Sequence, residues 1–107
     1  MAASDRGVYA ISVAAEMVSM QVQNLRVYER RGLVEPDRTP GGTRRYSPQD
    51  VERLHRIRDL LDEGLNLAGV AKVLELEATL EARLERLRLL EREVEELRAA
   101  VGPKRRR

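Results

Sequence analysis

The sequence contains no cysteine and a single histidine, His55. Without cysteine the chain cannot form disulfides, thiolate zinc sites or iron–sulfur clusters held by protein thiols. One histidine cannot chelate a metal by itself, so we expect neither a cofactor nor a metal or redox response. We expect His55 to be partly exposed beside the apolar stripe of a helix, without a functional role.

Long apolar runs are also missing, so nothing predicts a membrane span. The first residues lack the pattern of a secretory signal peptide. No nucleophile–base pair, paired acids or phosphate loop is recognisable in the sequence, which argues against an enzyme. We therefore expect a cytoplasmic protein that is not an enzyme.

The formal net charge is only +2. Residues 104–107 contribute +4, so the rest of the chain carries −2. All but two of the 20 cationic residues are arginine, and six arginines stand against three acids between Gln21 and Tyr46. Because the arginine fork matches phosphate geometry, this clustering favours a local anion-binding surface over a uniformly basic protein.

Two short helices separated by a tight break are predicted near the N-terminus. Ser12 is a favourable N-cap for a helix over Val13–Val18. Residues 19–20 form the break, a second helix covers Gln21–Arg31, and Gly32 follows as the residue that ends it. This pattern is typical of a helix-turn-helix motif.

The second of these helices has two different faces. At 100° per residue, Val22, Leu25 and Tyr28 point towards a core. The opposite face carries Gln23, Arg26, Val27 and Arg30. A solvated helix would have the same pattern, but the hairpin that follows favours a DNA-binding face.

The hairpin is predicted over Leu33–Tyr46. Residues 33–34 can start a strand, and Pro36 suits only its edge. Residues 40–42, Pro-Gly-Gly, fit a tight turn, and residues 43–46 return. The hairpin carries Arg38, Arg44 and Arg45, with Tyr46 behind them. Three arginines around one small turn repel one another unless an anion is bound, so the hairpin is interpreted as a DNA-binding wing.

Two more helices are predicted after the hairpin. Ser47, Pro48 and Asp50 form a helix start, and the apolar stripe of this helix is Val51, Leu54, Ile57, Leu60 and Leu61. Gly64 ends it. Asn66 can cap the next helix, over residues 67–76, whose inward residues are Val70, Val73 and Leu74.

From Val73 the apolar residues recur every 3.5 residues on average, which is coiled-coil periodicity. We expect dimerisation through Leu80, Leu84, Leu87, Leu90, Val94, Leu97 and Val101. The predicted organisation is a flexible arm over 1–7, a DNA-binding domain over 8–76, a dimerisation helix over 77–101 and a basic disordered tail over 102–107. We expect no sensor domain after the coil.

Residues 23–36, QNLRVYERRGLVEP, resemble the MerR family signature, which reads approximately TLRYYERxGLxxP. Residues 42–47 are similar to the family's G-x-R-R-Y wing, and the resemblance extends over about 11–76. It implies a mainly α, winged helix-turn-helix fold with a C-terminal antiparallel coiled coil. It also implies a homodimer that bends or twists double-stranded DNA at an inverted-repeat operator, and hence association with the nucleoid.

Within this family, residues 9–16, 38–47 and 63–70 are most similar to the heat-shock repressors. That resemblance implies repression of chaperone genes with the chaperone DnaK as co-repressor. The chain departs from the pattern on or beside the DNA-reading helix, at Gln21, Val22, Asn24 and Glu29, where His, Pro, Thr and Asp are expected.

The expected roles follow from side-chain chemistry. Gln23 and Asn24 have amides suited to adenine edges, and Val27 can touch a thymine methyl group. Phosphate contacts are expected from Arg26, Tyr28 and Arg30, and backbone or minor-groove contacts from the wing residues Arg38, Arg44, Arg45 and Tyr46. Two alternatives stay open: a MerR-type activator or other small regulator without a small-molecule effector, and a coiled-coil adaptor that binds protein through its head.

Overall fold

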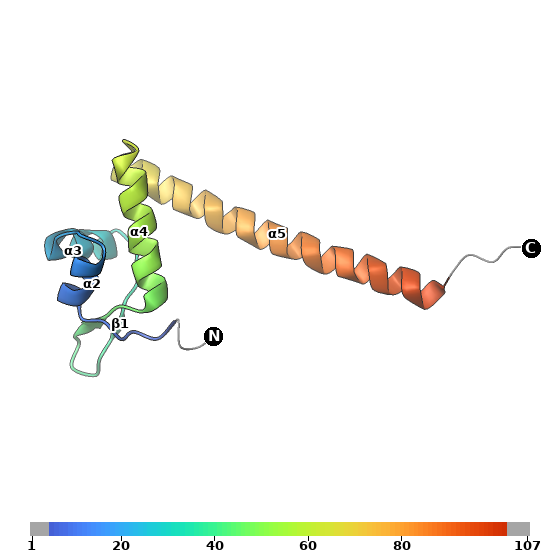
Figure 1. Cartoon of the computed structure of the whole chain (residues 1–107), viewed down its shortest axis with the longest axis horizontal. Coiled ribbons are helices and arrows are strands. Elements are labelled where there is room, and N and C mark those ends of the chain that lie inside the picture. The colour runs from blue at the N-terminus through green and yellow to red at the C-terminus, as the bar shows by residue number, and fades with distance from the viewer. Residues whose placement is uncertain (1–4, 103–107) are drawn as a thin grey trace, which may run out of the picture. The chain divides into compact units, whose positions relative to one another are not determined.

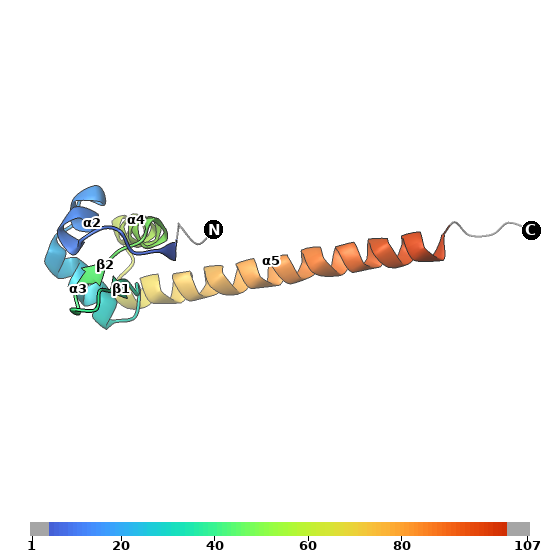
Figure 2. The ribbon, with the colours of Figure 1, turned by 90° about the horizontal axis from the view of Figure 1, so that it is seen from below.

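The structure is a computed structural model and describes residues 5–102. The order of elements is α2 (Ile11–Met17), α3 (Val22–Arg30), β1 (Asp37–Arg38), β2 (Arg44–Arg45), α4 (Pro48–Asp62) and α5 (Leu67–Val101) (Figures 1 and 2). The chain divides into two compact units, which meet between Val70 and Ala71. Of the expected basic tail, residues 103–107 lie outside the described residues, as do residues 1–4 of the expected arm.

The predicted start of α2 was wrong. Ala10, in extended conformation, occupies the N-cap position, and Ser12 lies inside the helix. The cause is tertiary: Tyr9 pairs with Tyr46, whose N–H donates to the Tyr9 carbonyl oxygen at 2.7 Å. The helix therefore begins as soon as this pairing ends, with the Ala14 N–H donating to the Ala10 carbonyl oxygen.

The turn between α2 and α3 is as tight as the sequence predicts. Ser19 adopts a positive φ of 56°, and the Met20 N–H closes the turn on the Ala15 carbonyl oxygen at 2.9 Å. α3 then begins and ends within one residue of the predicted bounds. Gly32 follows with a φ of 77°, a conformation that costs glycine little, and this ends the helix.

The hairpin is shorter than predicted. Leu33 and Val34 are buried core residues and form no strand, because the Leu33 carbonyl oxygen accepts a hydrogen bond from Nε of Arg53 on α4. Antiparallel pairing begins only after Pro36 and joins β1 to β2 with Arg38 opposite Arg44. At the turn, the Gly42 N–H donates to the Thr39 carbonyl oxygen at 2.8 Å, and Gly42 has a φ of 88°.

α4 begins with the predicted cap. The Asp50 N–H donates to Oγ of Ser47 at 2.9 Å, and the Ser47 N–H donates to Oδ2 of Asp50 at 3.0 Å. Arg58 of α4 donates to the carbonyl oxygen of Val18, which ties α4 to the turn after α2. The core of the first unit is made of Ala14, Ala15, Val18, Leu25, Tyr28, Leu33, Val34, Tyr46, Val51, Leu54, Ile57, Leu60 and Val70.

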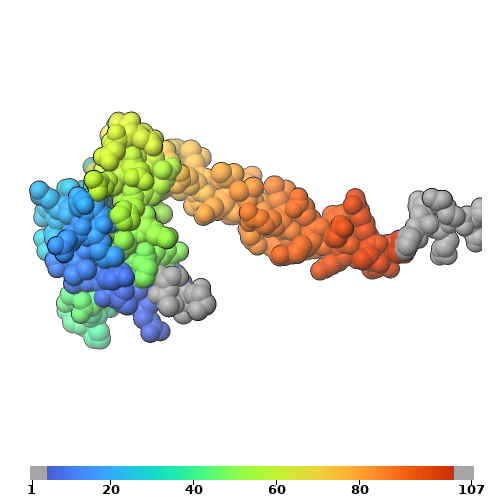
Figure 3. All heavy atoms as spheres, viewed as in Figure 1, coloured from blue at the N-terminus to red at the C-terminus, as the bar shows by residue number. Residues whose placement is uncertain are grey.

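α5 is one continuous helix, so the predicted helix end near Leu76 was wrong. Oδ1 of Asn66 accepts from the Gly69 N–H at 2.8 Å, as the predicted cap requires. After Gly69 the sequence has no glycine or proline before Gly102, so no residue in between strongly disfavours the helix. Figure 3 shows the side chains along the orange-to-red part of α5 in space-filling form.

Candidate nucleic-acid interface

The outer face of α3 is polar and exposed. Leu25 and Tyr28 are buried on its inner side, and Val27 is half-buried. The exposed side chains are Gln23, Asn24, Arg26 and Arg30. One face of α3 is therefore fixed in the core while amide and guanidinium groups are presented to solvent, which is the arrangement that a helix reading a DNA groove requires.

Glu29 joins α3 to the wing, which is defined here as residues 37–45. Its Oε2 lies 2.6 Å from Nη2 of Arg38, and its Oε1 accepts a hydrogen bond from Nε of Arg44. Nη1 of Arg38 also donates to the Gly42 carbonyl oxygen at 3.0 Å. One carboxylate thus binds an arginine from each strand of the wing.

The electrostatics of this cluster keep Glu29 ionised. Burial alone would raise the pKa of Glu29, but hydrogen bonds and charge attraction from Arg44 and Arg38 outweigh it and hold the pKa below its ordinary value. The hydrogen bond with Glu29 raises the pKa of Arg44. With two arginines against one carboxylate, the cluster keeps a positive charge, and charge-assisted bonds are about twice as strong as neutral ones.

The N-terminal segment forms hydrogen bonds with the wing and with Tyr46, the residue that follows it. The Gly7 N–H donates to Oδ2 of Asp37 at 2.9 Å. The amides of Val8 and Tyr9 both donate to the Tyr46 carbonyl oxygen, at 3.0 and 2.9 Å. Gly7, the last residue of the expected flexible arm, is therefore bonded to the wing.

Two tyrosines predicted as DNA contacts lie in the core. Tyr46 has 0% exposure, and its buried hydroxyl has no hydrogen-bond partner among the described residues. Tyr28 is 4% exposed. Burial raises the pKa of both phenols. We therefore correct the assignment of Tyr46 from a DNA contact to a packing residue, because neither its ring nor its hydroxyl is presented at the surface. The ring of Tyr28 also packs in the core, and its phosphate contact stays a prediction.

In the sequence Glu29 stands out only as a departure from the family pattern, which assigns it no site role. A signal was present: Glu29 is the only acid between Gln21 and Val34, in a segment that contains three arginines. A single acid among arginines next to an arginine-rich hairpin indicates an internal ion pair. Arg31, which follows α3 and is exposed, was also left out of the predicted contacts.

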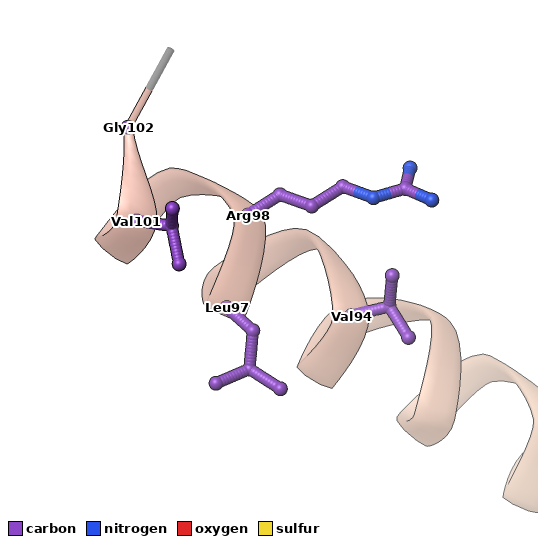
Figure 4. A pocket seen from close by; sticks show the side chains of 5 residues that line it. All are labelled: Val94, Leu97, Arg98, Val101 and Gly102. Atoms are coloured by element: carbon purple, nitrogen blue, oxygen red, sulfur yellow. The ribbon is translucent and has the colours of Figure 1, made fainter. Parts of the chain in front are cut away.

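The predicted dimerisation residues are all exposed along α5. They are Leu80, Leu84, Leu87, Leu90, Val94, Leu97 and Val101, and Leu76 is exposed as well. The exposed fraction reaches 66% for Leu97 and 82% for Val101. Shallow apolar hollows lie along the last turns, one of them lined by Val94, Leu97, Arg98, Val101 and Gly102 (Figure 4). An apolar surface of this length is a marker of an interaction site.

A helix with an exposed polar face, tied through one carboxylate to an arginine-bearing hairpin, defines a winged helix-turn-helix regulator. Residues 9–77 match the MerR HTH family of regulatory proteins, and the chain belongs to this family. Among residues 5–102, no helix combines the length and apolar character needed to cross a membrane.

Among similar sequences, a Streptomyces coelicolor protein described as heat shock protein HspR is 52% identical over 83 residues, which are 74% of this chain and 55% of that protein. The regulator GlnR of Bacillus anthracis is 41% identical over 66 residues, covering 62% of this chain and 51% of GlnR. The chain thus spans about half the length of these curated relatives.

Solved structures have the same fold. HiNmlR, a MerR family regulator that lacks the sensor domain and is bound to promoter DNA, matches with a TM-score of 0.63 and 25% identity, covering 88% of this chain and 73% of that one. MtaN, the N-terminus of the Bacillus subtilis multidrug transporter activator, matches with a TM-score of 0.61 and 25% identity, covering 88% and 94%.

Proposed function

We propose that the protein binds an inverted-repeat DNA operator as a homodimer and represses heat-shock or chaperone genes, with the chaperone DnaK as co-repressor. The observation that carries the DNA-binding part is the tie between α3 and the wing. Glu29 holds Arg38 and Arg44 while Arg26 and Arg30 stand exposed on α3. A single surface therefore combines amides that can read bases with arginines that can hold phosphates.

The roles divide between α3 and the wing. Gln23 and Asn24 read base edges in a major groove, and Val27 contacts a thymine methyl group. Arg26 and Arg30 bind phosphates and so position the helix without reading sequence. Arg45, Arg38 and Arg44 contact the flanking backbone or minor groove from the wing. In this proposal Tyr28 adds a phosphate contact through its hydroxyl, and Tyr46 stabilises the head.

The dimer supplies the symmetry of the operator. The exposed apolar stripe of α5 supports pairing of two chains, and a two-fold dimer presents two equivalent heads to two inverted half-sites. HiNmlR, whose fold is similar, is described as bound to promoter DNA. The heat-shock assignment rests on the 52% identity to HspR.

The test is DNA binding by the full chain, measured by fluorescence anisotropy. A duplex from upstream of a chaperone operon of the same genome is compared with a shuffled duplex over a range of salt concentrations. We expect the operator to bind at least about a thousandfold more tightly. With three or four phosphate contacts per protomer, a plot of log Kd against the logarithm of the salt concentration should have a slope of roughly five to seven. A protein-binding adaptor would bind neither duplex.

The co-repressor part has its own measurement. Purified DnaK is added to the operator complex, and tighter or supershifted operator binding without a change on shuffled DNA supports it. If DnaK does not change operator binding, the co-repressor role is contradicted, whereas the DNA-binding part of the proposal is not affected. The similarity to the activator fragment MtaN keeps an activator as the second candidate, and transcription in vitro from the same operator decides between them.

A further inference from the structure

The two faces of the wing differ in what their arginines contact. Arg38 and Arg44 lie opposite each other in the hairpin, and both bind Glu29. Because successive side chains of a strand point to opposite sides, Arg45 faces away from Glu29. Its partner in the register is Asp37. The wing therefore has an inner face, which contacts α3, and an outer face, which carries Asp37 and Arg45.

Gly7 packs closely on this outer face. Its N–H donates to Oδ2 of Asp37 at 2.9 Å. A Cβ atom at Gly7 would lie 2.5 Å from the carbonyl oxygen of Arg45 and 2.8 Å from its Cβ, so glycine is needed for so close an approach. Since adjacent Cα atoms are about 3.8 Å apart, the Cα atom of Arg6 lies within about 8 Å of Cβ of Arg45. The contact of Gly7 thus keeps the backbone of Arg6 beside Arg45.

The two arginines of this face are not paired with acids. Arg6 is exposed and Arg45 is half-buried, and within residues 5–102 neither forms an ion pair. Asp5 is exposed, and Asp37 accepts the hydrogen bond from Gly7 instead. Two guanidinium groups held near each other favour an anion, and their planar fork matches a phosphate.

The segment that carries Arg6 is fixed by its backbone. The amides of Val8 and Tyr9 donate to the Tyr46 carbonyl oxygen, and the Tyr46 N–H donates to the Tyr9 carbonyl oxygen at 2.7 Å. Together with the bond from Gly7 to the wing, these contacts reduce the freedom of the chain next to Arg6. A cation held in this way loses less conformational entropy on binding than one on a free arm.

On the basis of the DNA binding proposed above, we propose that Arg6 and Arg45 together bind a backbone phosphate of DNA on the outer face of the wing. The phosphate belongs to the DNA that flanks the half-site read by α3, because the outer face is turned away from α3. Gly7 and Asp37 are positioning residues for Arg6. Homeodomains likewise use arginines of an N-terminal arm beside the helix that reads the major groove. This contact comes in addition to the phosphate contacts counted above.

The test is DNA binding by the full chain, with affinity measured by anisotropy against salt concentration on the operator and shuffled duplexes. Arg6→Ala should weaken binding to both duplexes by at least about tenfold near 0.1 M salt and flatten the slope by roughly two units, since a dimer loses two contacts. Arg6→Lys should keep most of the slope, because lysine also binds phosphate. Arg92→Ala is the control: it removes the same charge from an exposed position on α5 and should leave the slope unchanged.

The positioning part is tested in two further backgrounds. Gly7→Ala places a Cβ atom against the carbonyl oxygen of Arg45, and Asp37→Ala removes the acceptor of the Gly7 N–H. In each background, adding Arg6→Ala should flatten the slope by less than about one unit, since Arg6 is no longer held at the phosphate. Circular dichroism at the temperature of the titration identifies the folded variants, and Asp37→Ala creates no close contact if Gly7→Ala does not fold.

The possible results separate the proposals. If Arg6→Ala does not change the slope in the unmodified background, Arg6 is not a DNA contact. If Arg6→Ala flattens the slope equally in all backgrounds, Arg6 acts as an unanchored charge and the site on the outer face is wrong. The shuffled duplex is sufficient for both decisions, because a phosphate contact does not depend on sequence. An unmodified chain that binds neither duplex contradicts instead the DNA binding of the proposed function.

Discussion

Glu29 on α3 accepts a hydrogen bond from Nε of Arg44 on β2, so α3 and the wing are joined by a charged contact. The same carboxylate binds Arg38 on β1. These contacts fix the wing relative to α3 before any ligand arrives. An interface held in place in advance loses less conformational entropy on binding. We therefore expect Glu29 to act by positioning the two wing arginines.

Glu29→Gln should lower the free energy of unfolding of the head by about 1 kcal/mol, because hydrogen bonds to a charged group are lost in a partly exposed cluster. The effect should depend on pH. The folded-state pKa of Glu29 lies below its ordinary value of 4.5, so its stabilisation is present above about pH 4.5 and is lost as the pH falls through the folded-state value.

Thermal unfolding followed by circular dichroism from neutral to acidic pH checks this prediction. The gap in melting temperature between the unmodified chain and Glu29→Gln should close as the pH falls. Glu35→Gln is the matched control, since Glu35 is exposed and should give no gap at any pH. A gap that persists unchanged at the acidic end would show that the ion pairs contribute nothing.

Tyr46→Phe should leave stability unchanged or raise it by up to about 1 kcal/mol, because the buried hydroxyl that it removes has no hydrogen-bond partner within residues 5–102. DNA affinity should not change, since the ring is buried. Tyr46→Ala, by contrast, should destabilise the head by about 3–5 kcal/mol through loss of a core ring. A Tyr46→Phe protein that is fully stable but binds DNA more weakly would restore Tyr46 as a DNA contact.

Gly7→Ala should dislodge the N-terminal segment from the wing. A Cβ atom at Gly7 would lie 2.5 Å from the Arg45 carbonyl oxygen and 2.8 Å from Cβ of Arg45. The expected cost is about 1–3 kcal/mol, read from denaturant unfolding. Gly41→Ala is the control, because the nearest atom to its Cβ would be Oγ1 of Thr39 at 3.9 Å. Equal stability of the two variants would contradict the close approach.

Arg30→Ala and Gln23→Ala should affect DNA binding in different ways. Arg30→Ala should weaken binding to operator and random DNA alike and flatten the salt dependence by roughly two units per dimer. Gln23→Ala should cost roughly 1–3 kcal/mol per half-site on the operator and leave random DNA nearly unaffected. Anisotropy titrations on both duplexes separate the two. If Gln23→Ala weakens all DNA equally, Gln23 is a backbone contact.

Leu84→Glu together with Leu87→Glu should dissociate the dimer, because unpaired charges buried in a helix seam cost several kcal/mol. Light scattering on the unmodified chain should report twice 12.2 kDa, and on the double variant the mass of one chain. Leu87→Met, which keeps the apolar volume, should stay dimeric. If the double variant remains a dimer, the interface does not lie on this stripe.

Several features could be predicted from the sequence because neighbouring residues determine them. The capping box needs only Ser47 and Asp50 three residues apart, and it forms as predicted. The end of α3 at Gly32 and the turn at Gly42 follow from the freedom of glycine at positive φ. The long amphipathic repeat of α5 can likewise be predicted from the spacing of its apolar residues.

Other features depended on contacts between distant residues, and there the local patterns gave wrong or incomplete answers. Ser12 lost its predicted cap because Tyr9 pairs with Tyr46, far along the chain. Leu33 lost its strand because Arg53 takes its carbonyl oxygen. A local pattern ranks what a segment can do in isolation, whereas burial and long-range hydrogen bonds decide which option has the lowest free energy.

The candidate DNA interface divides along the same line. The sequence by itself determined the exposed face of α3 with Gln23 and Arg26, because helical periodicity sorts polar from apolar side chains. Only the tertiary structure decided that Tyr46 is buried and that Glu29 binds the arginines of both wing strands. The physical reason is that an ion pair between residues 29 and 44 exists only once the hairpin has folded back against α3, and no pattern within either segment encodes that distance.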